Sequence, residues 1–151
     1  MIYLRPVEPK DTNLLFELKN DPDVIRYSVV SNQPIEIEVH RRYLKENLNY
    51  CNRLYCILDS MVNGVVGTVG VSIEPLNKAE INIRILKKYR QHGYGSFGVN
   101  WMVKHVRKLL PTHGIYAKIV WDNIASRELF KSCGFTECTH QPSTGIVWYS
   151  L

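Results

Sequence analysis

The stretch AEINIRILKKYRQHGYGSFG, residues 79–98, decides how the rest of the chain folds. Apolar and polar residues alternate over 79–85, which is the two-residue period of a half-buried strand. A basic segment follows, and then Gly93 and Gly95 open a helical pattern. Glycine lets the backbone approach a ligand closely, and the unpaired N–H groups at a helix start attract an anion. The stretch therefore predicts a strand, a phosphate-binding loop and a helix, and the ligand it favours is a pyrophosphate.

Other phosphate-binding motifs fit this stretch less well. A P-loop requires Gly-Lys-Ser/Thr, and the sequence contains no such triplet. Gly93, Gly95 and Gly98 spell G-x-G-x-x-G, but a dinucleotide-binding turn begins directly after its strand, and here residues 87–92 intervene. Only about fifty residues follow Gly98, too few for the further strand and helix units of that fold. The spacing therefore disfavours a dinucleotide site.

Arg90-x-x-Gly93-x-Gly95, placed between a strand and a helix, resembles the acetyl-coenzyme A signature of the GNAT acetyltransferases. A second segment, NIASRELFKSCGF at 123–135, is similar to that family's N-x-x-(S/A)-x-x-L-(Y/F)-x-x-x-G-F. The two motifs occur in the right order, and the resemblance covers nearly the whole chain. It implies an α+β (mixed α/β) GNAT fold, with a central, mostly antiparallel sheet of about six or seven strands flanked by about four helices.

The remaining patterns predict the elements of one domain over residues 1–151, a length suited to a single core. Asn63-Gly64 predicts a tight hairpin turn with positive φ at both residues. Asn20-Asp21-Pro22 is expected to end the first helix. The expected strands are 2–7, 53–60, 65–73, 79–86, 115–120, 135–140 and 146–150, and the expected helices are 9–20, 34–48, 96–110 and 123–133.

Composition narrows the class of partner. The net charge of +5 and the pI near 9.0 favour a polyanionic ligand such as coenzyme A or a nucleotide-linked substrate. The long basic stripe or recognisable module of a nucleic-acid-binding protein is missing, so no nucleic acid partner is expected. The sequence shows neither a signal-peptide pattern nor an apolar run of membrane-spanning length. We therefore expect a cytoplasmic protein with no membrane partner.

Four cysteines could suggest a metal site or a disulfide. Cys51 and Cys56 form one pair, Cys133 and Cys138 another, and both gaps are wider than the C-x-x-C of structural zinc knuckles. The pattern favours small buried thiols. No metal is expected.

The resemblance also implies a donor site. In GNAT enzymes the fourth and fifth strands splay apart, and the pantetheine arm of acetyl-CoA, the expected co-substrate, lies in the gap. By this resemblance Ile83, Arg84 and Ile85 would bind pantetheine through their backbone, and Asn123 would bond to it while also serving as a helix N-cap. The residues expected around the pyrophosphate are Arg90, Gln91, His92, Gly93, Tyr94, Gly95 and Ser96.

Two residues are candidates for catalysis. Glu80 matches the glutamate of the A-E-I-G-Y strand in one GNAT subgroup and would act as general base, directly or through water; a solvent-facing strand glutamate fits equally well. The usual thiolate acid is a tyrosine seven residues after the asparagine, and here that position is Phe130. Tyr149 is our candidate for the missing acid, with Tyr27, Tyr116, water or an unassisted thiolate as alternatives.

The prediction about the acceptor substrate is based on the stretch LLFELKNDPDVIRYS, residues 14–28. This stretch resembles a segment of the aminosugar and ribosomal-protein N-acetyltransferases that walls the acceptor site, which makes Asn20, Arg26 and Tyr27 candidate substrate contacts. The implied acceptor is a primary amine on an aminosugar, nucleotide-linked in our first hypothesis, with a protein N-terminus second. A catalytically silent acyl-CoA-binding module stays open, as does a homodimer. His40 either faces the acceptor pocket or has no catalytic duty, and the second is favoured.

Overall fold

The computed structural model describes residues 1–29, 33–47 and 53–151. Seven strands form one sheet in the order β1-β2-β3-β4-β5-β7-β6, in which only β4 and β5 run parallel. The strands are β1 (Ile2–Pro6), β2 (Arg53–Ser60), β3 (Gly64–Glu74), β4 (Lys78–Ile85), β5 (Gly114–Val120), β6 (Thr136–Gln141) and β7 (Ile146–Ser150). The helices are α1 (Thr12–Lys19), α2 (Pro22–Arg26), α3 (Ile37–Asn47), α4 (Tyr94–Leu109) and α5 (Ile124–Ser132), with 3-10 turns at η1 (Pro9–Asp11) and η2 (Lys87–Tyr89). The expected mixed α/β architecture is confirmed.

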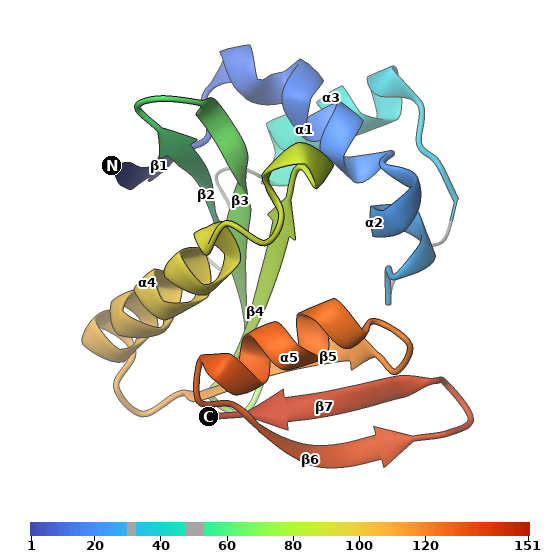
Figure 1. The fold of residues 1–151 in the computed structure, drawn as a ribbon, viewed down its shortest axis with the longest axis vertical. Coiled ribbons are helices and arrows are strands. Elements are labelled where there is room, and N and C mark those ends of the chain that lie inside the picture. Colours follow the sequence, from blue (N-terminus) through green and yellow to red (C-terminus); the bar gives the residue numbers. More distant parts are fainter. Residues whose placement is uncertain (30–32, 48–52) are drawn as a thin grey trace.

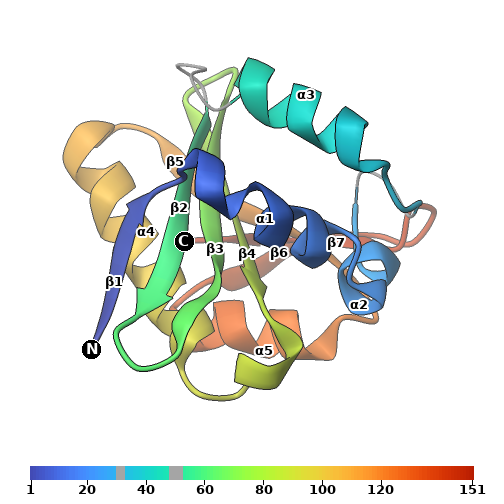
Figure 2. The ribbon, with the colours of Figure 1, turned by 90° about the horizontal axis from the view of Figure 1, so that it is seen from above.

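Helices cover both faces of the sheet (Figures 1 and 2). Helices α4 and α5 lie on one face, and α1, α2 and α3 lie on the other. Alternate residues of β4 therefore face different partners, because strand side chains point to opposite faces in turn. Ile83 faces α4, whereas Arg84 lines a small cavity under α1 and α3.

The core lies between the sheet and α4. Val99, Met102 and Val106 recur at three- and four-residue spacing on α4 and are buried, as the sequence predicts. Each such side chain stabilises the fold by about 1.5–3 kcal/mol. Gly98 brings the helix close to the sheet, since a β-carbon there would lie 3.0 Å from Ile83 Cδ1. Among the described residues, no helix is long and apolar enough to cross a bilayer.

Strands β4 and β5 separate after a short parallel contact. Residues 78–80 of β4 pair with residues 114–116 of β5. Beyond them β4 continues to Ile85 paired with β3 alone, and β5 continues to Val120 paired with β7 alone. Figure 1 shows the two strands diverging from this contact. We call the two stretches that do not pair with each other, residues 81–85 and 117–120, the β4–β5 split.

Two local expectations were wrong. At the β2–β3 hairpin Gly64 has positive φ but Asn63 does not, because residues 61–63 form a longer turn in which Ser60 Oγ accepts N–H bonds. Two consecutive residues with positive φ, Leu76 and Asn77, occur instead in the β3–β4 turn.

Asn20-Asp21-Pro22 ends the first helix, as expected, but residues 22–26 then form the short helix α2, which the sequence did not predict. The Asp21 side chain accepts N–H groups of the first turn of α2, and proline suits the first helical position. Cys138, expected to be buried, is exposed because all of β6 is exposed at the sheet edge. Cys133 is half-buried. Cys51 lies outside the described residues.

Candidate active site

The β4–β5 split leaves one hydrogen-bonding edge of β4 without a strand partner. Leu86 N donates to Val66 O on β3, and the direction of backbone groups alternates along a strand. The peptide groups of Ile81, Ile83 and Ile85 therefore point toward β5, into the split. An extended ligand arm could bind this edge as a further strand would. Of the backbone contacts expected from the resemblance, Ile83 and Ile85 face the split, and Arg84 faces β3.

The loop after β4 ends in an uncapped helix start. Gln91 and Gly93 have φ values of 63° and 80°, and no side chain caps the N-terminus of α4. The first turn therefore presents backbone N–H groups and the positive end of the helix dipole. Ser96 Oγ donates to Gly93 O, 3.1 Å away. A β-carbon on Gly93 would meet nothing within 4 Å, so glycine is required here by φ and leaves the approach to the N–H groups free.

Arg90 holds this loop in place. Its guanidinium donates to Asp23 Oδ2 at 2.6 Å and to Ile85 O at 3.0 Å, and Asp21 Oδ1 lies 3.5 Å away. The hydrogen bond from Arg90 lowers the pKa of Asp23. The side chain thus ties the loop to the end of β4 and to α2. In this arrangement its charge faces the two carboxylates, so any aid to a phosphate is indirect.

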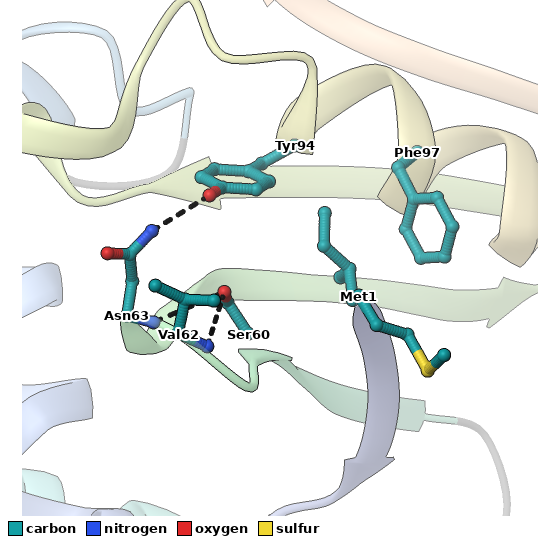
Figure 3. Close-up of a pocket in the computed structure, with 7 residues that line it drawn as sticks. Met1, Ser60, Val62, Asn63, Tyr94 and Phe97 are labelled. Atoms are coloured by element: carbon teal, nitrogen blue, oxygen red, sulfur yellow. Dashed lines mark hydrogen bonds between the residues drawn. The ribbon is translucent and has the colours of Figure 1, made fainter.

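Aromatic residues anchor the loop from its other side. Tyr94 OH accepts from Asn63 Nδ2 at 3.0 Å, Tyr89 OH donates to Asn63 O at 3.2 Å, and the His92 ring stacks on Tyr94. Figure 3 shows Tyr94 and Phe97 beside Met1 around an open hollow of about 530 Å³. This hollow lies at the β1–β2 side of the sheet, separated from the β4–β5 split by β3. We therefore do not assign it to the reaction.

Asn123 is the N-cap of α5, as expected. Its Oδ1 accepts from Ser126 N at 3.2 Å. Since β5 ends at Val120, this cap lies where the chain leaves the split strand. The Nδ2 group of Asn123 makes no hydrogen bond with any other described residue, so it could donate to a ligand arm.

Glu80 lies at the closed end of the split. Its Oε2 is 3.1 Å from Lys118 Nζ and 3.4 Å from Tyr116 OH, and all three side chains are buried or half-buried. Burial, followed by the charges of Glu80 and Glu74, raises the pKa of Tyr116. Trp148 stacks on Tyr116 and lies under the Lys118 ammonium. The group is therefore a carboxylate held by a cation and a phenol, beside an aromatic wall.

The structure does not bring Tyr149 to this group. Tyr149 pairs with Ala117, whereas Trp148 pairs with Lys118, so Tyr149 faces the other side of the sheet. It is 0% exposed, and its OH accepts from Arg127 Nε on α5 at 3.1 Å. Of the alternative tyrosines, Tyr116 is the one beside Glu80. The error arose because the sequence alone does not give the face on which a terminal strand places each residue.

The three residues expected at the acceptor have different surroundings. The Asn20 side chain already makes two hydrogen bonds within the protein: its Nδ2 donates to Ile35 O at 2.9 Å, and its Oδ1 accepts from Ile35 N at 3.0 Å. Arg26 is exposed, with its guanidinium 5.2 Å from the centre of the half-buried Tyr27 ring at the end of α2. Helix α2 lies near the outer ends of β7 and α5 in both Figures 1 and 2. Arg26 and Tyr27 thus remain available to a ligand, and Asn20 serves to close the 20–35 segment.

Sequence reasoning named Glu80 as a candidate base but did not connect it with the other polar side chains on the α1–α3 face of β4. Glu80, Asn82 and Arg84 share this face, and Asn82 Oδ1 is buried with no partner among the described residues. His40 of α3 is 3% exposed, and both of its ring nitrogens lack a partner within the described parts of the chain. The alternation of β4 could have pointed to the first three. Nothing in the local sequence marks His40 as unpaired.

Comparisons with known proteins show the family to which a chain with this fold and site belongs. The family model described as Acetyltransferase (GNAT) domain matches residues 2–136. An uncharacterized protein of Methanocaldococcus jannaschii is 24% identical over 135 residues, which cover 89% of this chain; the chain spans only 28% of that relative's length.

Two solved structures share the fold. A domain from M. jannaschii has a TM-score of 0.85 at 23% identity, covering 100% of this chain and 97% of that one. A spermidine N-acetyltransferase from Vibrio cholerae in complex with CoA and spermine has a TM-score of 0.86 at 17% identity, covering 99% of this chain and 92% of that one. At these identities the likeness extends to the fold.

Proposed function

The chain belongs to the GNAT acetyltransferase family, and from this membership we propose that it acetylates the primary amine of a nucleotide-linked aminosugar. Acetyl transfer from acetyl-CoA to an amine is the activity of the family. The aminosugar is our own choice of acceptor. The V. cholerae neighbour carries the name of a spermidine acetyltransferase, so a polyamine is the competing acceptor.

The observation that supports binding of acetyl-CoA, the acetyl donor, is the β4–β5 split together with the uncapped start of α4. The β4 edge at Ile81, Ile83 and Ile85 has no strand partner, although Ile85 O accepts from Arg90 Nε, and it leads to the N–H groups after Gly93. An extended amide-bearing arm fits the first feature, and a pyrophosphate fits the second. We assign pantetheine to the edge and the pyrophosphate to residues 91–96.

The proposed reaction uses the group at the closed end of the split. The amine nitrogen attacks the thioester carbon, a C–N bond forms, and the C–S bond breaks to release the thiolate of CoA. Glu80 takes the proton of the amine, directly or through water, and a backbone N–H near Ile83 stabilises the oxyanion. Tyr116 replaces Tyr149 as our donor of a proton to the thiolate, because its OH lies 3.4 Å from Glu80 Oε2, beside the proposed base.

Charge favours a negatively charged acceptor over a polyamine. The carboxylates nearest the proposed reaction are paired with cations: Glu80 is bound by Lys118, and Asp21 and Asp23 are bound by Arg90. The protein itself carries a net charge of +5. These features support an acceptor that bears phosphate. A protein N-terminus ranks behind it because the structure offers no further feature in its favour.

The test measures thiol release from acetyl-CoA with nucleotide-linked 4-amino-deoxysugars, free aminosugars, polyamines and peptides with free N-termini. We expect the highest kcat/KM with the nucleotide-linked sugars. A higher value with spermidine would overturn the acceptor. Tight binding of acetyl-CoA without turnover across the panel would indicate the silent binding module instead.

Gly93→Ala provides a check on the donor loop. The new β-carbon contacts no protein atom but is strained at a φ of 80° and stands near the exposed N–H groups. We expect about tenfold weaker binding of CoA in isothermal titration, with little change in the melting temperature. Wild-type affinity would refute the assignment of the pyrophosphate to this loop. A cytoplasmic location and a homodimer remain predictions.

A further inference from the structure

A small cavity lies between α1, α3 and the sheet, outside the groups assigned above to the reaction. Its volume is about 50 Å³, enough for a few water molecules or one small polar group. Its apolar lining comes from Val7, Leu15, Leu18 and Leu44. The polar groups in its wall include His40, Thr68 and Arg84.

His40 is the first sign that this cavity binds something. The side chain is 3% exposed, and neither ring nitrogen has a hydrogen-bond partner of good geometry among the residues that the structure describes; the backbone of Thr12 lies near the ring and interacts with it only weakly. A buried polar group left unpaired is destabilising, and such groups are rare in folded proteins. The nearby Phe16 ring, with its centroid 5.8 Å from that of His40, offers no such partner. A ligand in the cavity would supply it.

Arg84 is the second sign. It pairs with Thr68 across β3 and β4, so the two side chains lie next to each other on the face that lines the cavity. No hydrogen bond or ion pair joins Arg84 to any described residue, although it is only half-exposed. Other half-buried arginines among the described side chains are paired: Arg5 with Asp11 and Asp59, and Arg90 with Asp23. Arg84 therefore stands out as a cation without an anion.

We propose that the cavity lined by His40, Thr68 and Arg84 binds an anionic oxygen group of the acceptor, either a phosphate or a carboxylate. Guanidinium bonds such a group with two parallel N–H donors, and the imidazole and the hydroxyl add further donors. The proposal rests on the proposed function and deepens it, because it names the chemical feature that marks the acceptor.

The cavity lies within reach of the reacting amine. Glu80, Asn82 and Arg84 follow one another on the same face of β4, so Arg84 lies about 13 Å from Glu80 along the strand. Asn82, with its buried and unpaired Oδ1, lies between them. This amide oxygen can accept a hydroxyl or amine proton from the body of the acceptor. An acceptor with its amine toward Glu80 and its anion at Arg84 would satisfy all the unpaired groups in this row.

The main test compares acceptors that differ in the anion. One pair is a nucleotide-linked 4-amino-deoxysugar and the same sugar without the nucleotide; the other is glycylglycine and glycylglycinamide. We expect the wild type to favour the charged member of at least one pair by about 10- to 100-fold in kcat/KM. The pair that shows the preference identifies phosphate or carboxylate as the source. Equal kcat/KM within both pairs would overturn the proposal.

Variants then locate the preference. Arg84→Gln should abolish it by lowering kcat/KM for the charged member to the level of the uncharged member. The matched control is Arg41→Gln, which removes an exposed arginine next to His40 on α3 and should keep the preference. If Arg84→Gln folds poorly, Thr68→Val removes only the hydroxyl and should reduce the preference in part. A preference retained in both cavity variants would overturn the proposal.

A binding measurement separates this proposal from the proposed function. Protein labelled with ¹⁵N-histidine and saturated with CoA, which fills the donor site, is titrated with inorganic phosphate. We expect the ring signals of His40, assigned by their loss in His40→Leu, to shift in the wild type and in Arg41→Gln but not in Arg84→Gln. Such a shift without any acetyl transfer would sink the aminosugar function and keep the anion site. No His40 shift at tens of millimolar phosphate would sink the anion site.

Discussion

The two faces of β4 differ: one packs into the core, and the other carries the polar side chains that we propose serve the reaction. Toward α4 it presents Ile81, which is 2% exposed, and Ile83, which contacts the Gly98 position of the helix. Toward α1 and α3 it presents Glu80, Asn82 and Arg84. The first face is closely packed, whereas on the second the buried amide oxygen of Asn82 and the Arg84 guanidinium have no partner among the described residues.

This difference separates residues that the fold needs from residues that a ligand would use. A face selected for stability alone would not keep unpaired polar groups near a buried histidine, because each destabilises the folded state. Mutations on the α4 face should therefore change the free energy of unfolding. Mutations on the other face should change activity and leave stability equal or higher.

The largest effect is expected for Ile81→Ala. Truncation of a buried isoleucine leaves a cavity in the core, and we expect a loss of about 3–4 kcal/mol in the free energy of unfolding by urea denaturation. Arg84→Gln on the opposite face is the comparison, with an expected change within about 0.5 kcal/mol. Similar losses in both variants would erase the distinction between the two faces.

Glu80→Gln should come next. Loss of the proposed base is expected to lower kcat about 100-fold, or about 2.7 kcal/mol in activation free energy, with little change in the affinity for acetyl-CoA. The control is Glu128→Gln, which also removes a carboxylate paired with a lysine, Lys131, but on the exposed face of α5. Unchanged turnover at saturating amine would exclude Glu80 as the base.

His40→Leu should have the opposite sign on stability. It replaces two unpaired buried nitrogens with an apolar group, so we expect a gain of about 1–2 kcal/mol in the free energy of unfolding, together with weaker use of the acceptor. His105→Leu is the control. The His105 ring stacks on Trp101, with the ring centroids 4.8 Å apart, so its loss should give no gain in the free energy of unfolding. A destabilised His40→Leu would mean that the histidine supports the fold.

The smallest effect concerns pH. Burial, followed by the positive charge of Lys19, lowers the pKa of His40 below its ordinary value of 6.5. As pH falls below 6.5, His40 binds a proton in the unfolded chain but not in the folded protein. The free energy of unfolding therefore decreases with falling pH until the pH is below the lowered pKa of the folded state. Lys19, Tyr43 and Arg84 are the charged or titratable groups in the same cavity wall. The melting temperatures of wild type and His40→Leu should diverge between pH 7 and pH 5; parallel curves would contradict this prediction.

Much of the fold was predictable because its signals are local. The alternation in β4 and the three- and four-residue spacing in α4 each follow from one stretch of chain. Helix α2 was missed because a helix of five residues shows no periodicity, and its start depends on the Asp21 side chain.

The site was less predictable because it depends on register between distant strands. Glu80 meets Lys118 only because β4 and β5 pair over three residues before they part. Tyr149 was assigned to the wrong face for the same reason, since its orientation follows from the pairing of β5 with β7. That Arg84 has no anionic partner among the described residues depends on which side chains the fold places around it, and a sequence does not show this.

The link that Arg90 makes between the donor loop and the aspartates at the start of α2 has a kinetic consequence. We expect CoA bound at this loop to restrain α2 through that link, and with it Arg26 and Tyr27, the residues that we propose to contact the acceptor. The two substrates should therefore bind in a compulsory order, with acetyl-CoA first. An unreactive analogue of the acceptor would then inhibit uncompetitively against acetyl-CoA, and cutting the tether with Arg90→Ala would turn the pattern toward random addition.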